Sequence, residues 1–112
     1  LNGEQTLGEN IADNGGVKEA YLAYTNWVKR NGPEPTLPSL KYTPEQLFWI
    51  SSANAWCMKQ TKKFLEDTIK SDPHSPNRYR VLIPFSNTEY FSKDFNCPVG
   101  SKMNPKHKCQ VW

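Results

Sequence analysis

The segment that most constrains the fold is a short run of helix-breaking residues, Asn31-Gly32-Pro33-Glu34-Pro35-Thr36-Leu37-Pro38. A proline has no backbone N–H to donate and its ring clashes with the preceding helical turn, so a helix does not continue through three of them. Whatever forms before residue 31 is therefore separated by a loop from whatever forms after residue 38. With 112 residues, the chain makes one ordinary domain at most.

Helical patterns lie on both sides of this loop. A helix over about residues 8–30, which Asn31-Gly32 ends, is predicted by the spacing of its apolar residues, Val17, Ala20, Tyr21, Tyr24, Trp27 and Val28. The stripe expected to be buried runs through Val17, Ala20, Tyr24 and Trp27. After the loop, Thr43-Pro44-Glu45-Gln46 indicates a second helix start, in which Thr43 and Gln46 form a capping box and proline takes the first helical position. The residues that follow, 47–57, are apolar nearly all round, which is typical of a helix packed on several sides.

The rest of the chain predicts more helix and little strand. Residues 60–70 favour a polar surface helix that ends before Asp72-Pro73. The run Val81-Leu82-Ile83 favours a short extended piece that Pro84 ends, and Ser86-Asn87-Thr88-Glu89 favours a second capping box before a short helix. Residues 97–112 are rich in turn formers and are expected to be irregular. The fold class expected from these patterns is mainly α.

Composition excludes several classes of protein. Apolar residues make up 37% of the chain and aromatic residues 12%, as in a globular protein. No apolar run approaches the roughly 20 residues of a membrane-spanning helix, so no transmembrane segment is expected. Residues 1–56 carry six acids and four Lys/Arg, net −2, whereas residues 57–112 carry five acids and ten Lys/Arg, net +5. Because these basic residues are scattered singly or in pairs, they indicate a solvated surface rather than a nucleic-acid partner.

Two carboxylates interrupt the apolar face of the first predicted helix. Asp13 lies four residues before Val17, and Glu9 lies four residues before Asp13, so both continue the stripe that is expected to be buried. One reading is a solvated helix start, where acids are favoured by the helix dipole. The other is a metal site, with Glu9 as a ligand and Asp13 one turn later holding a second ligand in place.

A second cluster of polar residues begins at Asp72-Pro73-His74-Ser75-Pro76 and is followed by Arg80. Ser75 and Pro76 indicate the start of a new turn, which would fix His74 on a rigid corner. A single histidine is often only a hydrogen-bonded structural residue, but a fixed His74 with Arg80 nearby could also stabilise a developing oxyanion. His107, between Lys106 and Lys108, is expected to be a surface residue.

Sequence motifs spanning nearly the whole chain resemble the neprilysin and endothelin-converting-enzyme family of zinc metallopeptidases. The segment from Asn2 to Gly16, which includes Gly8-Glu9-Asn10-Ile11-Ala12-Asp13, resembles the family segment that bears the third zinc ligand. Asp72-Pro73-His74-Ser75-Pro76 followed by Arg80-Val81 is similar to the family pattern D-x-H-S-P…R-V. Between and after these lie further matching residues: Tyr42-Thr43, Gln46-Leu47-Phe48, Trp56-Cys57, Cys97-Pro98, Met103-Asn104-Pro105 and Cys109-Gln110-Val111-Trp112.

The resemblance implies a fold and a set of chemical roles. The whole chain, residues 1–112, would be the C-terminal helical part of a thermolysin-like (gluzincin) catalytic lobe. Glu9 would be a ligand of a single Zn²⁺ ion, and Asp13 would accept a hydrogen bond from a zinc-bound histidine. His74 would stabilise the oxyanion that forms when water attacks the peptide carbonyl.

Substrate-binding roles follow from the same resemblance. Arg80 would hold the backbone carbonyl of the substrate residue after the scissile bond, and Trp56 and Ala55 would line the pocket for its side chain. The family cleaves short peptides before hydrophobic residues, and its members are ectodomains of type II membrane proteins or secreted relatives. An extracellular location is therefore expected.

One family motif is missing from this chain. The sequence contains no H-E-x-x-H, which supplies two zinc ligands and the general base, so that motif is expected upstream of Leu1. The chain alone is then expected to be inactive, with the remainder of the peptidase as its partner. The alternative is a non-catalytic helical module that serves as an interaction surface or antigen.

The cysteine count also suggests missing partners. Three cysteines cannot all pair within one chain, and their spacing contains no C-x-x-C of the kind found in zinc sites. In the family that the chain resembles, the matching positions each form a disulfide with an upstream cysteine. The resemblance therefore implies external partners for Cys57, Cys97 and Cys109.

Overall fold

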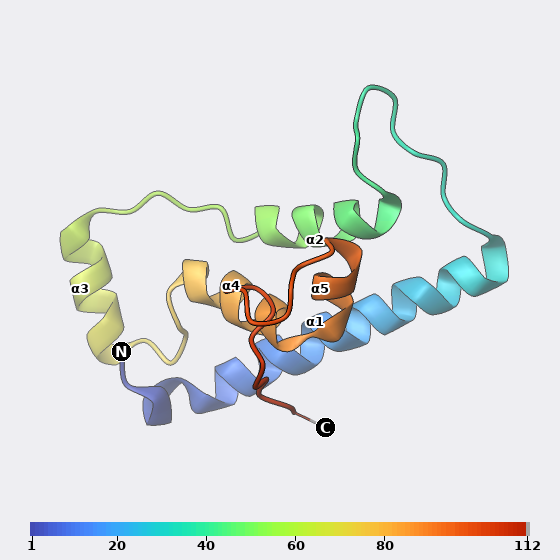
Figure 1. Ribbon diagram of the computed structural model, residues 1–112. Coiled ribbons are helices and arrows are strands. Elements are labelled where there is room, and N and C mark those ends of the chain that lie inside the picture. Colours follow the sequence, from blue (N-terminus) through green and yellow to red (C-terminus); the bar gives the residue numbers. More distant parts are fainter. Residues whose placement is uncertain (112) are drawn as a thin grey trace.

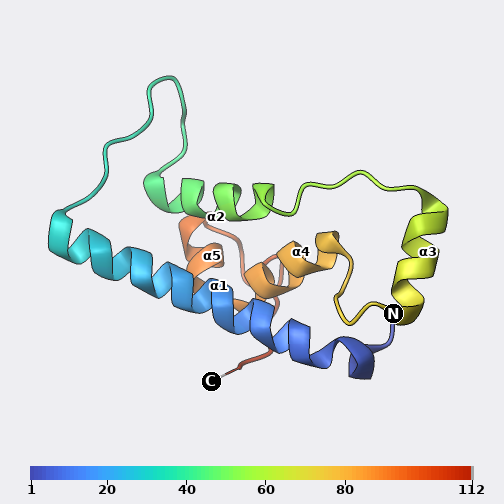
Figure 2. The same cartoon turned by 180° about the vertical axis from the view of Figure 1, so that it is seen from behind.

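The computed structural model describes residues 1–111, and these residues form five helices. Their bounds are α1 (Gly3–Asn31), α2 (Pro44–Asn54), α3 (Lys62–Ser71), α4 (Asn77–Asn87) and α5 (Glu89–Asp94). The long α1 runs along one side, α4 and α5 lie between it and α2, and α3 stands at one end near the N-terminus (Figure 1). The view from behind shows the proline-containing loop 32–43 projecting away from the helices (Figure 2). The prediction of a mainly α chain is confirmed, and the β structure within residues 1–111 is a single bridge between Ser101 and Asn104.

Most predicted helix ends agree with the structure. Helix α1 begins five residues earlier than expected, because the Asn2 side chain accepts a hydrogen bond from the Glu4 N–H at 3.0 Å and caps it. Its predicted stop is confirmed at Gly32, whose φ of 84° ends the helix. The Thr43 capping box is also confirmed, with Gln46 N–H donating to Thr43 Oγ1 at 3.2 Å and Thr43 N–H donating to Gln46 Oε1 at 3.1 Å.

The prediction of an extended piece at residues 81–83 is wrong. These residues lie within α4, which continues through Pro84 and buries it together with Phe85 and Ser86. Pro84 cannot donate to the carbonyl of Arg80, but packing of this apolar turn against the rest of the core offsets that loss. An isolated apolar run of three residues does not distinguish a strand from a buried helical turn.

The second predicted capping box is also misplaced. Ser86 lies inside α4, where its hydroxyl donates to the carbonyl of Ile83 at 2.9 Å. The cap of α5 is instead Thr88, whose hydroxyl accepts from the N–H of Phe91 at 3.1 Å. The short helix was therefore expected correctly, but its start lies two residues further along the chain. The expected irregular tail is confirmed for residues 97–111.

The aromatic core joins α1, α2 and α4 through Tyr21, Trp49 and Phe85, which are 5%, 1% and 5% exposed. Two expectations about burial are corrected by it. On α1 the buried tyrosine is Tyr21, whereas Ala20 and Trp27 are exposed. On α2, which was expected to be buried on several sides, Trp49 is fully buried and the other apolar residues remain partly accessible.

A carboxylate fastens this core. Asp94 Oδ2, at the end of α5, accepts hydrogen bonds from the Tyr21 hydroxyl and the Trp49 indole N–H, both at 2.7 Å. Burial, and then the hydrogen bond to Asp94, raise the pKa of Tyr21 above its usual range, so the hydroxyl keeps the proton that it donates. One side chain thus ties α5 to both α1 and α2.

Replacing Asp94 with alanine is expected to lower the free energy of unfolding by about 2–6 kcal/mol, because two buried donors would each lose their acceptor at about 1–3 kcal/mol apiece. Urea unfolding of the full-length protein measures the change. The matched control is Asp67→Ala, because the Asp67 side chain is 61% exposed on α3. Equal unfolding midpoints for the two variants would show that Asp94 does not fasten the core.

Candidate functional site

The two polar clusters of the sequence meet where α1 faces α4 and the loop before it. The most buried contact is between Asp13 on α1 and Arg80 on α4, whose side chains are 12% and 14% exposed. Arg80 donates from Nε to Asp13 Oδ2 and from Nη2 to Asp13 Oδ1, both at 2.7 Å. This two-bond pairing raises the pKa of Arg80, and it uses one edge of the guanidinium while leaving the Nη1 edge for another acceptor.

Trp56, just after the end of α2, contacts the same guanidinium. The Arg80 guanidinium carbon lies 4.0 Å from the centre of the Trp56 ring, a cation–π contact. Asn77, at the start of α4, donates to the Trp56 carbonyl at 3.1 Å and so holds the ring's segment against α4. Ala55, the C-cap of α2, is exposed beside it. The predicted substrate-binding residues Arg80, Trp56 and Ala55 therefore lie together.

His74 lies between two carboxylates. Asp72 Oδ1 is 2.8 Å from His74 Nδ1 and also accepts the His74 backbone N–H at 2.8 Å. On the other side of the ring, His74 Nε2 is 3.3 Å from Glu9 Oε2. The backbone hydrogen bond from His74, followed by the side-chain one, lowers the pKa of Asp72, so this carboxyl is ionised at neutral pH. Glu9 and His74 remain 41% and 42% exposed, which leaves both open to a further ligand.

Several neutral side chains were missed by the sequence reasoning, although they hold the two clusters together. Gln5 donates to the carbonyl of Asp72 at 2.8 Å, and the Ser75 hydroxyl donates to Asn10 Oδ1 at 2.8 Å. Asn87, at the end of α4, donates to Asn14 Oδ1 at 2.9 Å. For Gln5 a signal was available, because Gln5, Glu9 and Asp13 repeat at a spacing of four residues on one helix.

Two open grooves lie near this cluster, one lined by Arg80 and the other by Trp56. One, of about 430 Å³, runs between α1 and α4 and has mainly apolar walls, including Leu7, Ile11 and Ile83. The other, of about 550 Å³, lies between the end of α2, α3 and the start of α4, and Trp56 and Leu65 line it. Apolar clefts beside a few fixed polar groups are typical of binding sites.

The side chains of residues 1–111 that could bind a metal ion do not make a complete zinc site. Catalytic zinc takes three protein ligands, and within residues 1–111 no cluster of three His, Cys, Asp or Glu side chains could hold a metal ion. Glu9 and His74 come together, but Asp72 lies on the far side of the imidazole and is engaged with its Nδ1 atom. The Glu9 carboxylate is exposed enough to bind a metal ion, but the described residues place no second and third ligand beside it.

The remaining site predictions concern cysteines and surface residues. Cys57, Cys97 and Cys109 are all free thiols, and Cys57 and Cys109 are exposed. His107 is exposed, as expected. Within residues 1–111, no helix is long and apolar enough to span a membrane.

Comparison with known proteins gives consistent matches along the chain. The model of peptidase family M13 matches residues 1–111. The chain is 55% identical to neprilysin-2 of Drosophila melanogaster and 56% identical to endothelin-converting enzyme 1 of Bos taurus, in each case over all of the chain but only 14% and 15% of the relative. A solved structure, the Haemonchus galactose containing glycoprotein complex, superposes with a TM-score of 0.88 at 44% identity, over 95% of this chain and 19% of that one.

Proposed function

The chain belongs to peptidase family M13, and on this basis we propose that it is the C-terminal part of the catalytic domain of a zinc-dependent metalloendopeptidase. The proposal rests mainly on two contacts: Glu9 lies against His74, and Asp13 forms an ion pair with Arg80. Glu9 and Asp13 are one helical turn apart on α1. The chain covers about 15% of its curated relatives, so the rest of the catalytic centre would come from the remainder of the peptidase.

Glu9 would supply one ligand to the zinc ion, and Asp13 would orient a histidine ligand contributed by the upstream part. A carboxylate has about four lone-pair positions on its two oxygens, so Asp13 can accept from that histidine while it still holds Arg80. When bound, the zinc would polarise the substrate carbonyl and activate water. In many zinc proteins a carboxylate that does not bind the metal accepts a hydrogen bond from a zinc-bound histidine and so fixes the orientation of its ring.

In its imidazolium form, with Nδ1–H donating to Asp72, His74 would also donate from Nε2 to the oxygen of the peptide carbonyl as negative charge develops on it, once Glu9, which lies 3.3 Å from Nε2, binds the zinc ion. Asp72 holds Nδ1 and the backbone N–H of His74, so the ring is already aimed before substrate arrives. A donor that needs no reorganisation stabilises the transition state more than the ground state. His74 is therefore proposed to act in the chemical step.

Arg80 would bind the substrate backbone carbonyl after the scissile bond through its unused Nη1 edge. Trp56, stacked on the guanidinium, and Ala55 would form part of the pocket for the adjacent hydrophobic side chain. The substrates proposed are short peptides cut before hydrophobic residues.

The exposed apolar surface supports the proposal that the upstream part of the same protein packs against this segment. Leu7, Tyr79 and Ile83, around the groove between α1 and α4, are 57%, 47% and 49% exposed. Apolar surface of this extent is normally covered in a soluble protein. We propose that the upstream part covers it, that Cys57, Cys97 and Cys109 form disulfides with cysteines there, and that the whole protein is an extracellular ectodomain or secreted enzyme.

A direct test compares the full-length protein with residues 1–112 alone. The full-length protein is expected to cleave a short peptide with a hydrophobic residue after the scissile bond and to lose that activity to a zinc chelator. The isolated segment is expected to show no cleavage with added zinc, because it contributes only one zinc ligand. Zinc-dependent cleavage by the purified segment, or a full-length protein indifferent to the chelator, would contradict the proposal.

A further inference from the structure

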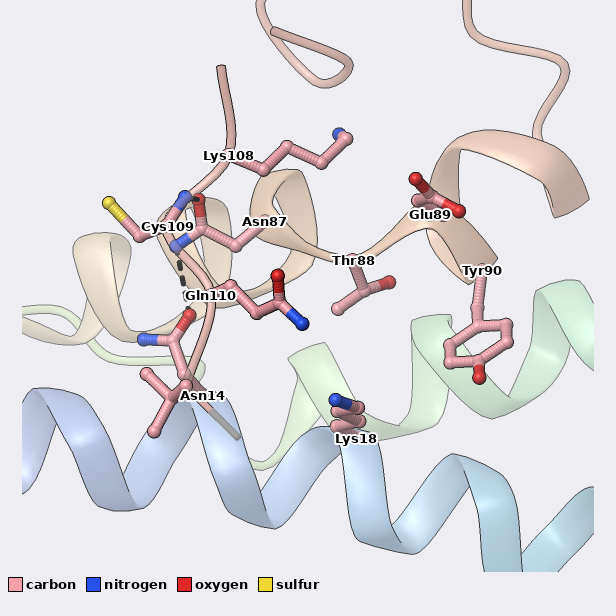
Figure 3. A pocket seen from close by; sticks show the side chains of 10 residues that line it. Asn14, Lys18, Asn87, Thr88, Glu89, Tyr90, Lys108, Cys109 and Gln110 are labelled. Carbon is pink, nitrogen blue, oxygen red and sulfur yellow. Dashed lines mark hydrogen bonds between the residues drawn. The ribbon is translucent and has the colours of Figure 1, made fainter. Parts of the chain in front are cut away.

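The C-terminal tail is hydrogen-bonded to the end of α4, and Asn87 links this contact to α1. Asn87, the last residue of α4, donates from Nδ2 to Asn14 Oδ1 at 2.9 Å and accepts the N–H of Cys109 on Oδ1 at 3.1 Å. Figure 3 shows Asn87 lying between Asn14 on α1 and the tail at Cys109. Both functional ends of this amide are therefore used, one toward α1 and one toward the tail.

The hydrogen-bond chain continues on both sides of Asn87. Asn14 donates from its own Nδ2 to the carbonyl of Asn10 at 2.7 Å, so its side chain is also held at both ends. Near the tail, Lys108 donates from Nζ to the carbonyl of Ser86 at 2.6 Å, which adds a second contact between the tail and the end of α4. The tail is therefore hydrogen-bonded to the end of α4, which is in turn hydrogen-bonded to α1.

The position of Asn87 matters because α4 also carries Arg80. Asn14 is the next residue after Asp13 on α1, whereas Asn87 lies seven residues after Arg80, about 10 Å further along α4. Adjacent residues of α1 therefore hold α4 at two separated points, Asp13 to Arg80 and Asn14 to Asn87. Together with the packing of Phe85 in the core, these two hydrogen-bonded points restrain the direction of α4 relative to α1.

From this geometry we propose that Asn87 is a positioning residue for substrate binding: by joining the tail and α1 to the end of α4, it fixes the direction in which the Arg80 guanidinium presents its Nη1 edge. Without Asn87, the end of α4 loses its side-chain hydrogen bonds to α1 and to the tail, so it shifts relative to the Asp13–Arg80 pair and the Nη1 edge no longer meets the substrate carbonyl at a fixed angle. This proposal rests on the proposed role of Arg80. It assigns Asn87 an effect on substrate affinity, not on the chemical step.

The test uses the full-length peptidase and the variants Asn87→Leu, Asn87→Asp and Arg80→Met. Leucine has nearly the shape of asparagine but neither donates nor accepts, so Asn87→Leu is expected to raise KM about 3- to 10-fold, the equivalent of one or two neutral hydrogen bonds, with kcat changed less than twofold. Aspartate still accepts the Cys109 N–H and can accept from a rotated Asn14 amide, so Asn87→Asp is expected to recover most of the affinity. The matched control is Asn26→Leu, an exposed site on α1.

The outcomes separate this proposal from the one on which it rests. If Arg80→Met raises KM but Asn87→Leu leaves it unchanged, the positioning role of Asn87 is wrong and the role of Arg80 stands. If Arg80→Met leaves KM unchanged, the substrate-binding role of Arg80 is wrong, and the role proposed for Asn87 is wrong with it. An Asn87→Leu enzyme that only unfolds at a lower temperature, with unaltered KM when folded, would mean that Asn87 contributes stability alone.

Discussion

Replacing Glu9 with alanine in the full-length peptidase is expected to abolish zinc retention and peptidase activity together. A catalytic zinc ion is held by three protein ligands, and Glu9→Ala would remove one of them. The two that remain are not expected to retain the ion during dialysis. We propose Glu9 for this role because its carboxylate is 41% exposed and its contact with His74 Nε2, at 3.3 Å, leaves oxygen lone pairs for a metal ion. Zinc content per mole of dialysed protein and hydrolysis of a short peptide measure the two losses.

The control for this experiment lies on the same helix. Glu19 is exposed on α1, ten residues after Glu9, and Glu19→Ala is expected to keep normal zinc content and activity. Asp13→Ala is expected to weaken both properties by about 10–100-fold, as changes to the residues that orient zinc ligands do. A Glu9→Ala enzyme that still carried one zinc ion and cleaved peptide at the normal rate would remove Glu9 from the metal site.

The local signals in the sequence were sufficient for most of the fold. Thr43, Pro44 and Gln46 each favour a helix start for an independent reason, and the capping box is found there. The loop at Pro33, Pro35 and Pro38 separates α1 from α2 as expected. Such features are determined by residues a few positions apart, so no knowledge of the tertiary structure is needed to infer them.

The errors arose where tertiary packing decides between two local possibilities. Val81, Leu82 and Ile83 form an apolar run that also fits a strand, but α4 packs a partly buried Val81 and a buried Phe85 against the aromatic core that includes Trp49 of α2. In the same way, the face of α1 was assigned through Ala20 and Trp27, whereas the stacking of Tyr21 on Trp49, with ring centres 4.9 Å apart, selects a slightly rotated face. Neither choice can be made from one helix alone.

The candidate site was predicted as two separate clusters, and the sequence could not give the contacts between them. The spacing of Glu9 and Asp13 indicates a shared face of α1, but their contacts with His74 and Arg80 join residues more than 60 positions apart in the chain. Asn14 and Asn87, both partly buried in the structure, carry no such signal, because asparagine is also common at helix ends that make no tertiary contact. Their role depends on the path of the tail.

The second large effect is expected at His74. In the full-length enzyme, His74→Ala is expected to lower kcat by about 10²–10³-fold with little change in KM, because the lost hydrogen bond forms fully only with the developing oxyanion. Arg80→Met is expected to show the opposite pattern, a raised KM with a smaller change in kcat, because Arg80 would bind the substrate carbonyl in the ground and transition states alike. Steady-state kinetics on one short peptide separate the two. The matched control for the histidine is His107→Ala, an exposed position in the tail.

Asp72 provides a stricter test of the same assignment. If Asp72 acts only by aiming the His74 ring through Nδ1, then Asp72→Ala is expected to lower kcat by less than His74→Ala does, and the double variant is expected to be no slower than His74→Ala alone. Additive losses would mean that Asp72 stabilises the transition state by a route independent of His74. If His74→Ala instead raised KM and left kcat unchanged, His74 would be a substrate-binding residue, and the oxyanion would have to be stabilised by groups outside this segment.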